Sequence, residues 1–149
     1  MDQRIVKFIR RHHVVTLTTI GPEGEPWSCN LFYAFLPEAN ALVFTSQEHT
    51  RHTREMESGG LVSASIVLET RLVGRLQGLQ IQGTVSKASA ENPLGETARR
   101  KYLRRFPYAI FALGELWILS ITKLKYTDNT LGFGTKLHWT SEAEEAGWI

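Results

Sequence analysis

Hydroxyl and cationic side chains gather in one short stretch of the sequence, directly after the apolar run that ends at Phe44. The candidate ligands are Thr45, Ser46, Thr50, Arg51 and His52. A helix that starts near Thr50 would present free backbone N–H groups and the positive end of its dipole, which together favour a phosphate. Hydroxyl groups add single hydrogen bonds, and an arginine adds a planar pair of donors. The stretch is a candidate phosphate site, although an ordinary N-capped surface helix would have the same sequence.

A hairpin precedes this stretch in the sequence. Residues 16–20 read as a strand, Gly21 to Pro26 as a turn with strong breakers, and Trp27 onward as a second strand. The hairpin and the hydroxyl–arginine stretch, in this order and spacing, resemble the N-terminal half of the FMN-binding split-barrel superfamily, the group that includes pyridoxamine 5′-phosphate oxidase. That family pattern is a strand, a Gly-x-Pro turn, a strand, a strand ending in Thr-Ser, and Ser/Thr-Arg-Lys at a helix start. The resemblance covers most of the chain.

The resemblance implies roles for the hydroxyl–arginine stretch. Arg51 matches the arginine that binds the FMN phosphate, and the hydroxyl ligands match Thr45, Ser46 and Thr50, with Phe44 just before them. His52 stands where relatives carry lysine, and a neutral imidazole supplies one donor and no full charge near pH 7. A bound phosphate would hold His52 protonated. An exposed helix residue without a ligand is an equal alternative for His52.

The resemblance also implies where the flavin ring would lie. A ring needs an apolar slot with donors near its reactive nitrogens, and relatives lay it against the strand that corresponds to Ser28, Cys29, Asn30 and Leu31. Strand alternation puts Ser28 and Asn30 on one face, so either could bind the ring, whereas Cys29 points into the core and would contact it through the backbone.

Two further segments match positions that approach the flavin in relatives. Gln80 precedes a glycine in a predicted strand and is the candidate for a ring contact, with Gln77 and Gln82 as competitors because the register is open. The tail that contains Lys136 and Trp139 resembles a C-terminal segment that approaches the flavin of the partner subunit. The alternative for this tail is packing in a dimer.

The predicted elements favour a mainly β fold. We expect a first helix capped by Asp2, a helix from Thr50 to Glu57, and a third helix from Asn92-Pro93 to about Arg105. The expected strands cover 14–20, 27–36, 41–46, 61–68, 79–85 and 116–126, the segment 71–77 is ambiguous, and a glycine-containing tail follows from Asp128. These elements, and the resemblance, predict a six-stranded antiparallel split β-barrel with Greek-key character and two to three flanking helices.

Length and composition restrict the class of protein. The 149 residues suit one domain, expected to be a single FMN-binding split barrel over 1–149, and 42% apolar with 21% charged residues is typical of globular proteins. A net charge of +2 does not indicate nucleic acid, and no apolar run is long enough to cross a bilayer. The single Cys29 excludes an internal disulfide, and no secretory segment is recognisable. We expect a cytoplasmic protein without membrane or nucleic-acid partners.

The leading hypothesis is an FMN-dependent oxidoreductase, built as a homodimer with flavin sites at the subunit interface. It would pass hydride or electrons to a small-molecule substrate, and a nicotinamide donor would dock transiently at the flavin. No acid, base, nucleophile or metal-ligand set is recognisable, so no catalytic residue and no metal are assigned. The family's C-terminal arginine-rich substrate motif is missing, which disfavours pyridoxamine 5′-phosphate oxidase activity itself.

Three alternatives stay open at this stage. The protein could bind flavin without turnover, as a carrier, sensor or electron-transfer module. Some superfamily members bind haem or a deazaflavin instead, and the available axial ligands for haem are His12, His13, His49 and His138. The fold could also have lost its pocket and serve as an interaction protein.

Overall fold

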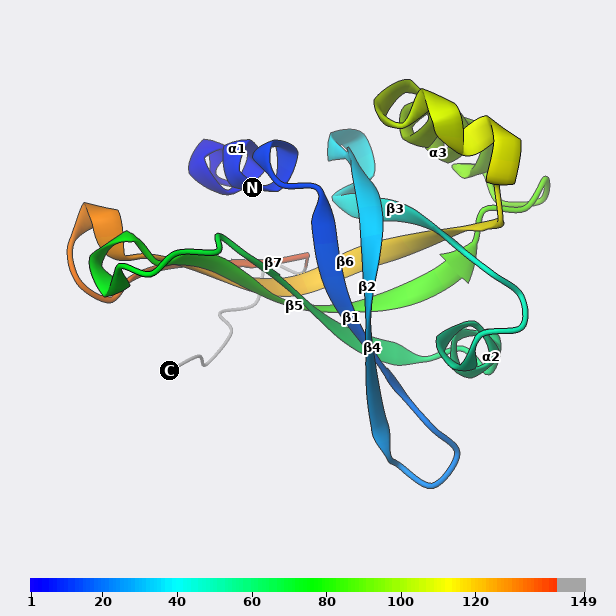
Figure 1. Cartoon of the computed structure of the whole chain (residues 1–149), viewed down its shortest axis with the longest axis horizontal. Coiled ribbons are helices and arrows are strands. Elements are labelled where there is room, and N and C mark those ends of the chain that lie inside the picture. Colours follow the sequence, from blue (N-terminus) through cyan, green and yellow to red (C-terminus); the bar gives the residue numbers. More distant parts are fainter. Residues whose placement is uncertain (142–149) are drawn as a thin grey trace.

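The computed structural model describes residues 1–141 and shows a mainly β molecule with helices at its periphery (Figure 1). The strands are β1 (Val14–Ile20), β2 (Pro26–Leu36), β3 (Ala41–Ser46), β4 (Leu61–Val67), β5 (Gln77–Lys87), β6 (Glu115–Asp128) and β7 (Thr135–Thr140). The helices are α1 (Gln3–Arg11), α2 (Arg51–Glu57) and α3 (Gly95–Arg105). The predicted strands are confirmed, each to within two residues at either end.

The strands pair antiparallel in the order β3-β2-β1-β4-β5-β6-β7, and an additional β3–β6 pairing closes β1 to β6 into a barrel. The predicted six-stranded antiparallel barrel is therefore confirmed. β7 is an extra strand beside β6, with Leu137 opposite Tyr126 and Trp139 opposite Leu124. The expectation of a tail after Asp128 was wrong here, because alternating apolar residues in 135–140 pair with the long free edge of β6.

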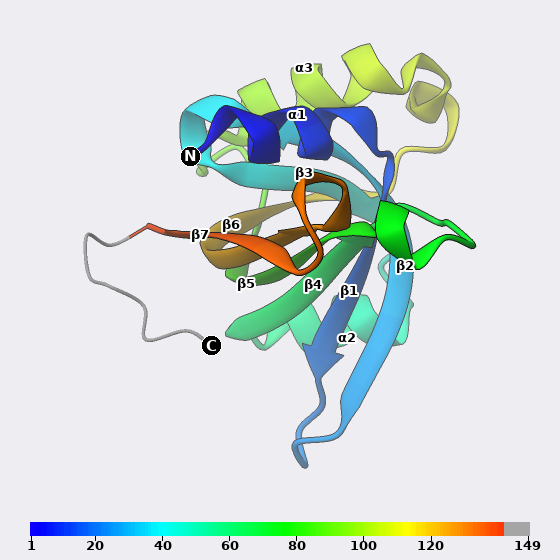
Figure 2. The same ribbon diagram turned by 90° about the vertical axis from the view of Figure 1, so that its left-hand side faces the viewer.

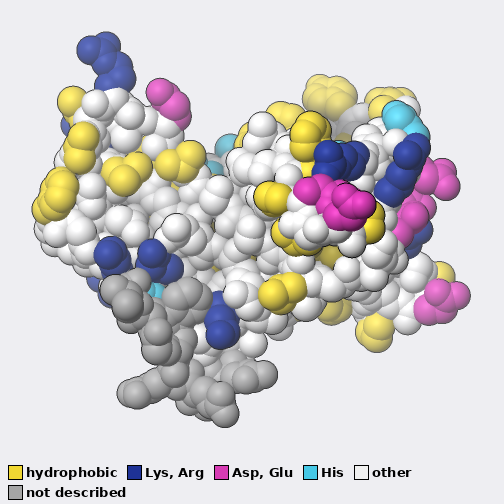
Figure 3. Space-filling view, turned by 90° about the horizontal axis from the view of Figure 1, so that it is seen from below, with side chains coloured by type: hydrophobic (Ala, Val, Ile, Leu, Met, Phe, Trp, Pro, Cys, Tyr) yellow, Lys and Arg dark blue, Asp and Glu magenta, His cyan; other side chains and the backbone are white. Residues whose placement is uncertain are grey.

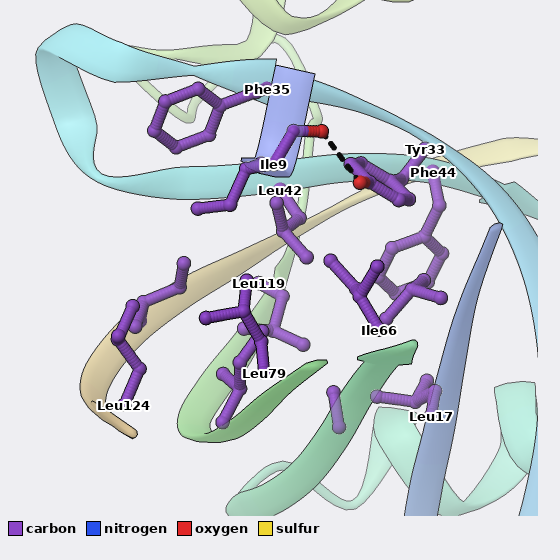
Figure 4. Packing of buried hydrophobic residues seen from close by; sticks show 14 of the residues in the cluster. Ile9, Leu17, Tyr33, Phe35, Leu42, Phe44, Ile66, Leu79, Leu119 and Leu124 are labelled. Atoms are coloured by element: carbon purple, nitrogen blue, oxygen red, sulfur yellow. Dashed lines mark hydrogen bonds between the residues drawn. The ribbon is translucent and has the colours of Figure 1, made fainter. Parts of the chain in front are cut away.

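Alternation along the strands fills the barrel with apolar side chains (Figure 4). In β1, for example, Val15 and Leu17 point inward and are fully buried, whereas Val14 and Thr16 do not join the core. The buried face of α1, formed by Ile5, Phe8 and Ile9, packs against the same core. The Tyr33 hydroxyl donates a 2.6 Å hydrogen bond to the backbone oxygen of Ile9, which ties α1 to β2.

A second, smaller apolar cluster lies outside the barrel, where α3 covers β2 and β3. Ala98 and Tyr102 of α3 pack there with Ala34, Leu36 and Val43 of the two strands. Figure 2 shows α1 and α3 on the same side of the sheet. The two helices thus hold β2 and β3, the strands that lead into the hydroxyl–arginine stretch.

Two helix starts differ in their capping. Asp2 caps α1 as predicted, accepting a hydrogen bond from the backbone N–H of Arg4. α3 begins at Gly95, about two residues later than predicted, because the Asn92 side chain is used in the preceding turn. The Asn92 amide nitrogen donates to Lys87 O at 2.9 Å, and the Asn92 side-chain oxygen accepts from Leu94 N at 3.0 Å. Asn92 therefore organises the entry to the helix without capping it.

The segment 71–77 before β5, which was ambiguous in the sequence, contains a short 3₁₀ turn, Val73–Arg75.

Among the described residues, no helix has both the length and the apolar character needed to cross a membrane.

Candidate functional site

Four polar side chains at the end of β3 and the start of α2 form one hydrogen-bonded cluster. Ser46 Oγ lies 2.7 Å from His52 Nε2 and also bonds the hydroxyl of Thr53. Thr50 Oγ1 lies 2.9 Å from Thr53 Oγ1 and 3.2 Å from His52 Nε2. The structure therefore brings together three predicted residues, Ser46, Thr50 and His52, and adds the buried Thr53, which the sequence interpretation did not include.

The start of α2 leaves backbone donors available. Thr50 has extended backbone angles at the N-cap position, but its hydroxyl donates to Gln47 O at 2.8 Å and does not cap the helix. The first N–H groups of an α-helix have no acceptor within the helix. The first turn, which begins at Arg51, thus offers N–H groups beside a hydroxyl cluster, as the sequence pattern predicted.

Arg51 joins α2 to the start of β2. Its guanidinium lies 4.5 Å from the centroid of the Trp27 ring, and its Nε donates to Glu55 at 2.9 Å. Glu25, in the β1–β2 turn, lies 3.9 Å from Arg51. The arginine side chain is still 44% exposed, so part of its donor set faces solvent. Figure 3 views the molecule from below, where cationic and anionic side chains lie next to one another.

Burial keeps His52 neutral. Loss of solvent is the main cause that lowers the pKa of His52 below its ordinary value of 6.5, and the nearby Glu55 carboxylate only partly opposes it. One Glu55 oxygen binds Arg51, and the other is buried without a hydrogen-bond partner among the described residues. The full positive charge in this cluster at neutral pH therefore belongs to Arg51.

Phe44 and Thr45 contribute differently from Ser46. The Phe44 side chain is fully buried in the barrel core. Thr45 points to the opposite face of β3, where its hydroxyl lies 3.3 Å from the hydroxyl of Tyr102. Neither side chain joins the cluster around Ser46, so contact with a ligand at this cluster would come from their backbone.

The candidate ring-binding residues of β2 alternate as predicted. Ser28 and Asn30 are exposed on the outer face, where their side chains bond Thr18 and Thr16 of β1, each at 2.8 Å. Cys29 and Leu31 are half-buried against the barrel core. Burial raises the pKa of the Cys29 thiol to about 11, so Cys29 is a packed, unreactive thiol.

The strand register narrows the alternatives around Gln80 to Gln80 and Gln82. Asn30, Thr16, Ser65 and Gln80 lie directly opposite one another across β2, β1, β4 and β5. Gln80 and Gln82 therefore belong to the outer face, whereas the Gln77 side chain bonds Asp128. Three strand spacings separate Asn30 from Gln80, about 14 Å along the sheet.

Lys136 and Trp139 lie on β7, which pairs with residues 123–128 of β6, whereas Ser46 of β3 pairs with Glu115 at the opposite end of β6. Lys136 is exposed and Trp139 is half-buried against the barrel core. Alternation puts their side chains on opposite faces of β7. The structure does not bring either residue to the cluster at Arg51 within one chain.

Two contributors to the site were missed from the sequence besides Thr53. Trp27 was assigned only to the strand, and Glu55 only to the helix. Spacing gives a signal for Glu55, because Arg51 and Glu55 are separated by four residues in a helix. No comparable signal links Trp27 to Arg51, because their contact depends on the fold.

The described part of the chain holds no group of three His, Cys, Asp or Glu side chains that could bind a metal ion.

The fold and the site together define a split β-barrel with a hydroxyl–arginine turn, residues 46–52, beside its second strand. Residues 1–118 match the sequence profile described as pyridoxamine 5′-phosphate oxidase. The chain belongs to the pyridoxamine 5′-phosphate oxidase family. A UPF0306 protein of Yersinia pseudotuberculosis is 35% identical over 136 residues, which is 91% of this chain and 90% of the relative.

Solved structures share the fold at low sequence identity. A haem-binding protein from Mycobacterium smegmatis has a TM-score of 0.71 at 21% identity; the match covers 86% of this chain and 52% of that longer chain. HutZ, the haem storage protein of Vibrio cholerae, has a TM-score of 0.69 at 17% identity; the match covers 80% of this chain and 89% of HutZ. The conserved hypothetical protein Rv2991 of Mycobacterium tuberculosis has a TM-score of 0.67 at 17% identity; the match covers 95% of this chain and 93% of Rv2991.

Proposed function

We propose that this protein binds FMN and acts as a flavin-dependent oxidoreductase on a small-molecule substrate. The observation that carries the proposal is the contact between Arg51 and Trp27, which puts the hydroxyl–arginine turn beside the strand that would receive the ring. Membership of the pyridoxamine 5′-phosphate oxidase family supports the same ligand.

The donor set at the turn fits a phosphate group. Arg51 keeps exposed N–H groups after its bond to Glu55, Thr50 leaves the first turn of α2 uncapped, and hydroxyls lie beside both. A phosphate accepts hydrogen bonds only, and its charge complements a guanidinium. Arg51 would hold the phosphate. Ser46 would donate to it after giving up a bond within the cluster, and Thr50 would donate to it after giving up its bond to Gln47 O.

The bound flavin would supply the hydride or electron transfer. Ser28 and Asn30 would orient one edge of the ring, because their side chains lie on the exposed face of β2. The half-buried Cys29 and Leu31 keep the strand packed on the core and so fix its position. No acid or base is assigned, in keeping with chemistry that is carried by the cofactor.

We propose a homodimer in which the outer face of β2, β1, β4 and β5 is covered by the second copy. Two polar rows cross this face, and exposed apolar residues flank them: Val14, Ile20, Phe32, Leu61 and Val67. An apolar depression of about 350 Å³ lies on the same face between Ile20, Leu61 and Gln80. Exposed apolar side chains that gather on one face in this way favour contact with a protein partner. Gln80, about 14 Å from Asn30, would then contact the flavin bound by the other subunit. Of the two β7 candidates, the exposed Lys136 would approach that flavin, because Trp139 packs against its own barrel core.

Haem binding is the second candidate function. Two of the structural neighbours are a haem-binding protein and a haem storage protein. His13 and His49 are exposed, His13 after α1 and His49 just before α2, so both are accessible as axial ligands. A haem-binding protein would need one of these imidazoles, whereas the FMN proposal needs Arg51.

The experiment that tests the proposed function is a titration of the purified protein with FMN. Arg51→Ala should weaken FMN binding by about tenfold or more, because charge-assisted hydrogen bonds to the phosphate are lost. Arg54→Ala is the matched control, since Arg54 is an exposed arginine on the same helix and contacts the cluster through its backbone N–H, which the substitution keeps. Equal affinities of the wild type and Arg51→Ala would reject the phosphate role, and equal losses in both variants would indicate a general charge effect.

A further inference from the structure

Positive charge is concentrated on the two helices that cover one side of the sheet. α1 carries four and α3 carries five of the seventeen Lys and Arg residues, while Glu96 is their one acidic residue. The described ion pairs involve Arg4, Arg51 and Lys87, and none involves a cation of α3. Basic residues in the last turn of each helix complement the helix dipole, but this does not explain why those of different helices converge.

The convergence occurs in a cleft of about 200 Å³ between α1, α3 and β2. Four cations line it, Arg10 of α1 with Lys101, Arg104 and Arg105 of α3, and buried Ala34 and Phe35 form its apolar side. A second depression, along α1, begins at the same Arg10 and is lined also by Lys7 and Arg11. No carboxylate of the described residues lines either depression.

Arg105 is held rigidly in this cleft. Its guanidinium donates to the backbone oxygens of Tyr33 at 3.0 Å and Arg10 at 3.1 Å, and also to that of His12. It also lies 5.3 Å from the Tyr33 ring centroid. A guanidinium has five N–H groups, so these bonds leave donors unused, and neutral carbonyls do not cancel its charge. Arg105 is therefore a fixed cation whose position does not depend on a ligand.

We propose that the cleft between α1 and α3 binds a small compound that carries two or more closely spaced anionic groups, such as phosphates or carboxylates. The fixed Arg105 preorganises the site, and the side chains of Arg10, Lys101 and Arg104 would bind the ligand from both helices. The cleft is confined and takes its cations from two helices, which suits a small ligand better than an extended nucleic-acid backbone.

The proposed cleft is separate from the hydroxyl–arginine turn, so it does not rest on FMN binding. Its test is isothermal titration of the full chain with inorganic diphosphate, and in a second arm with citrate, at low salt. Lys101→Gln/Arg104→Gln should weaken binding by about tenfold, because two charge-assisted contacts are lost. Arg99→Gln/Arg100→Gln is the matched control, with the same charge change on the same helix but outside the cleft, and it should weaken binding by no more than about twofold.

Diphosphate can also bind at the hydroxyl–arginine turn, so the titration is repeated in Arg51→Ala, where the binding that Lys101→Gln/Arg104→Gln weakens should persist. A preference for diphosphate over citrate would identify phosphates as the ligand groups, and equal binding would identify anionic oxygens in general; both support the cleft. Absence of heat with both probes would overturn the proposal. Equal weakening in the two double variants would also overturn it, since that indicates diffuse attraction, and loss in Arg51→Ala would move the binding to the turn.

Discussion

Arg51 and His52 are adjacent in the sequence but differ in what they offer an anion. Arg51 is partly exposed and always charged, whereas His52 is half-buried, bonded to Ser46 and neutral at pH 7. A lysine at position 52, as in the family pattern that the sequence resembles, would add a second charge. This protein would therefore depend on Arg51 and on the α2 backbone for holding a phosphate, which makes Arg51→Ala the most informative single substitution.

His52 predicts a pH dependence of folding stability. Because its pKa is lower in the folded than in the unfolded protein, the unfolded chain binds more protons in the window below about pH 6.5. The stabilisation is present above that pH and is lost as the pH falls through the window. Denaturant unfolding at pH 7.5 and pH 5.5 measures this loss.

His52→Gln is the control for this prediction, since an amide keeps a hydrogen bond to Ser46 and does not titrate. The pKa of His13, an exposed residue, is also lowered by partial loss of solvent and by the nearby charge of Arg105, so part of the pH dependence will remain in the variant. A loss between the two pH values that is as large in His52→Gln as in the wild type would contradict the assignment.

At the scale of single elements, Gly83 marks the most sensitive point of β5. The β5–β6 register shifts between Gln82 and Gly83, and a Cβ at position 83 would lie 2.4 Å from the backbone oxygen of Ser120. Gly83→Ala should lower the free energy of unfolding by about 2 kcal/mol or more, because the clash is with backbone in a packed barrel. Gly78→Ala, in the same strand, is the matched control, since its nearest contact would be an ordinary 3.4 Å.

Denaturant unfolding of the two glycine variants provides the measurement. A loss for Gly83→Ala that is no greater than the loss for Gly78→Ala would show that the bulge can relax, and would contradict the close approach of β5 and β6.

Elements were more predictable from the sequence than the contacts between them. The β-branched run Val14 to Ile20 and the breakers around Gly21 and Pro26 placed the hairpin correctly because they act locally. β7 was missed because a short strand depends on a neighbouring edge for its hydrogen bonds. The α3 start was displaced because Asn92 bonds the end of β5, a partner that sequence spacing does not reveal.

The same distinction applies to the candidate site. Ser46, Thr50 and His52 lie within seven residues of one another, so their clustering followed from the strand end and the helix start. Thr45 was included with them, but strand alternation turns its side chain toward Tyr102. The contact of Trp27 with Arg51 arises from the fold of the hairpin against α2, and no local pattern encodes it.

At the scale of the whole molecule, the outer face of β2, β1, β4 and β5 predicts self-association. Val67→Lys places a charge on this face, where Val67 is 60% exposed, and should shift a dimer toward monomer by at least about tenfold in Kd if the face is covered by a second copy. Val73→Lys is the matched control, because Val73 is 66% exposed on the loop before β5. Analytical ultracentrifugation measures both. A wild type that stays monomeric at high concentration, or a dimer unaffected by Val67→Lys, would contradict the proposed interface.

The distribution of charge and apolar surface gives the molecule distinct sides. Cations concentrate over α1 and α3, whereas the hydroxyl–arginine turn and the proposed dimer face lie around α2 and the outer sheet. The two proposed ligand sites therefore have separate anchoring residues, and a variant at one should leave the other intact. This separation lets each proposal be tested without disturbing the fold that both share.

The measurement that most directly tests the account is an absorbance spectrum of the purified protein, recorded before and after addition of FMN and dialysis. A two-banded flavin spectrum that survives dialysis in the wild type and is lost in Arg51→Ala is the predicted result. An intense Soret band without flavin bands would contradict it and favour haem, with His13 and His49 as the first residues to replace. A protein that retains neither chromophore would contradict the proposed oxidoreductase function altogether.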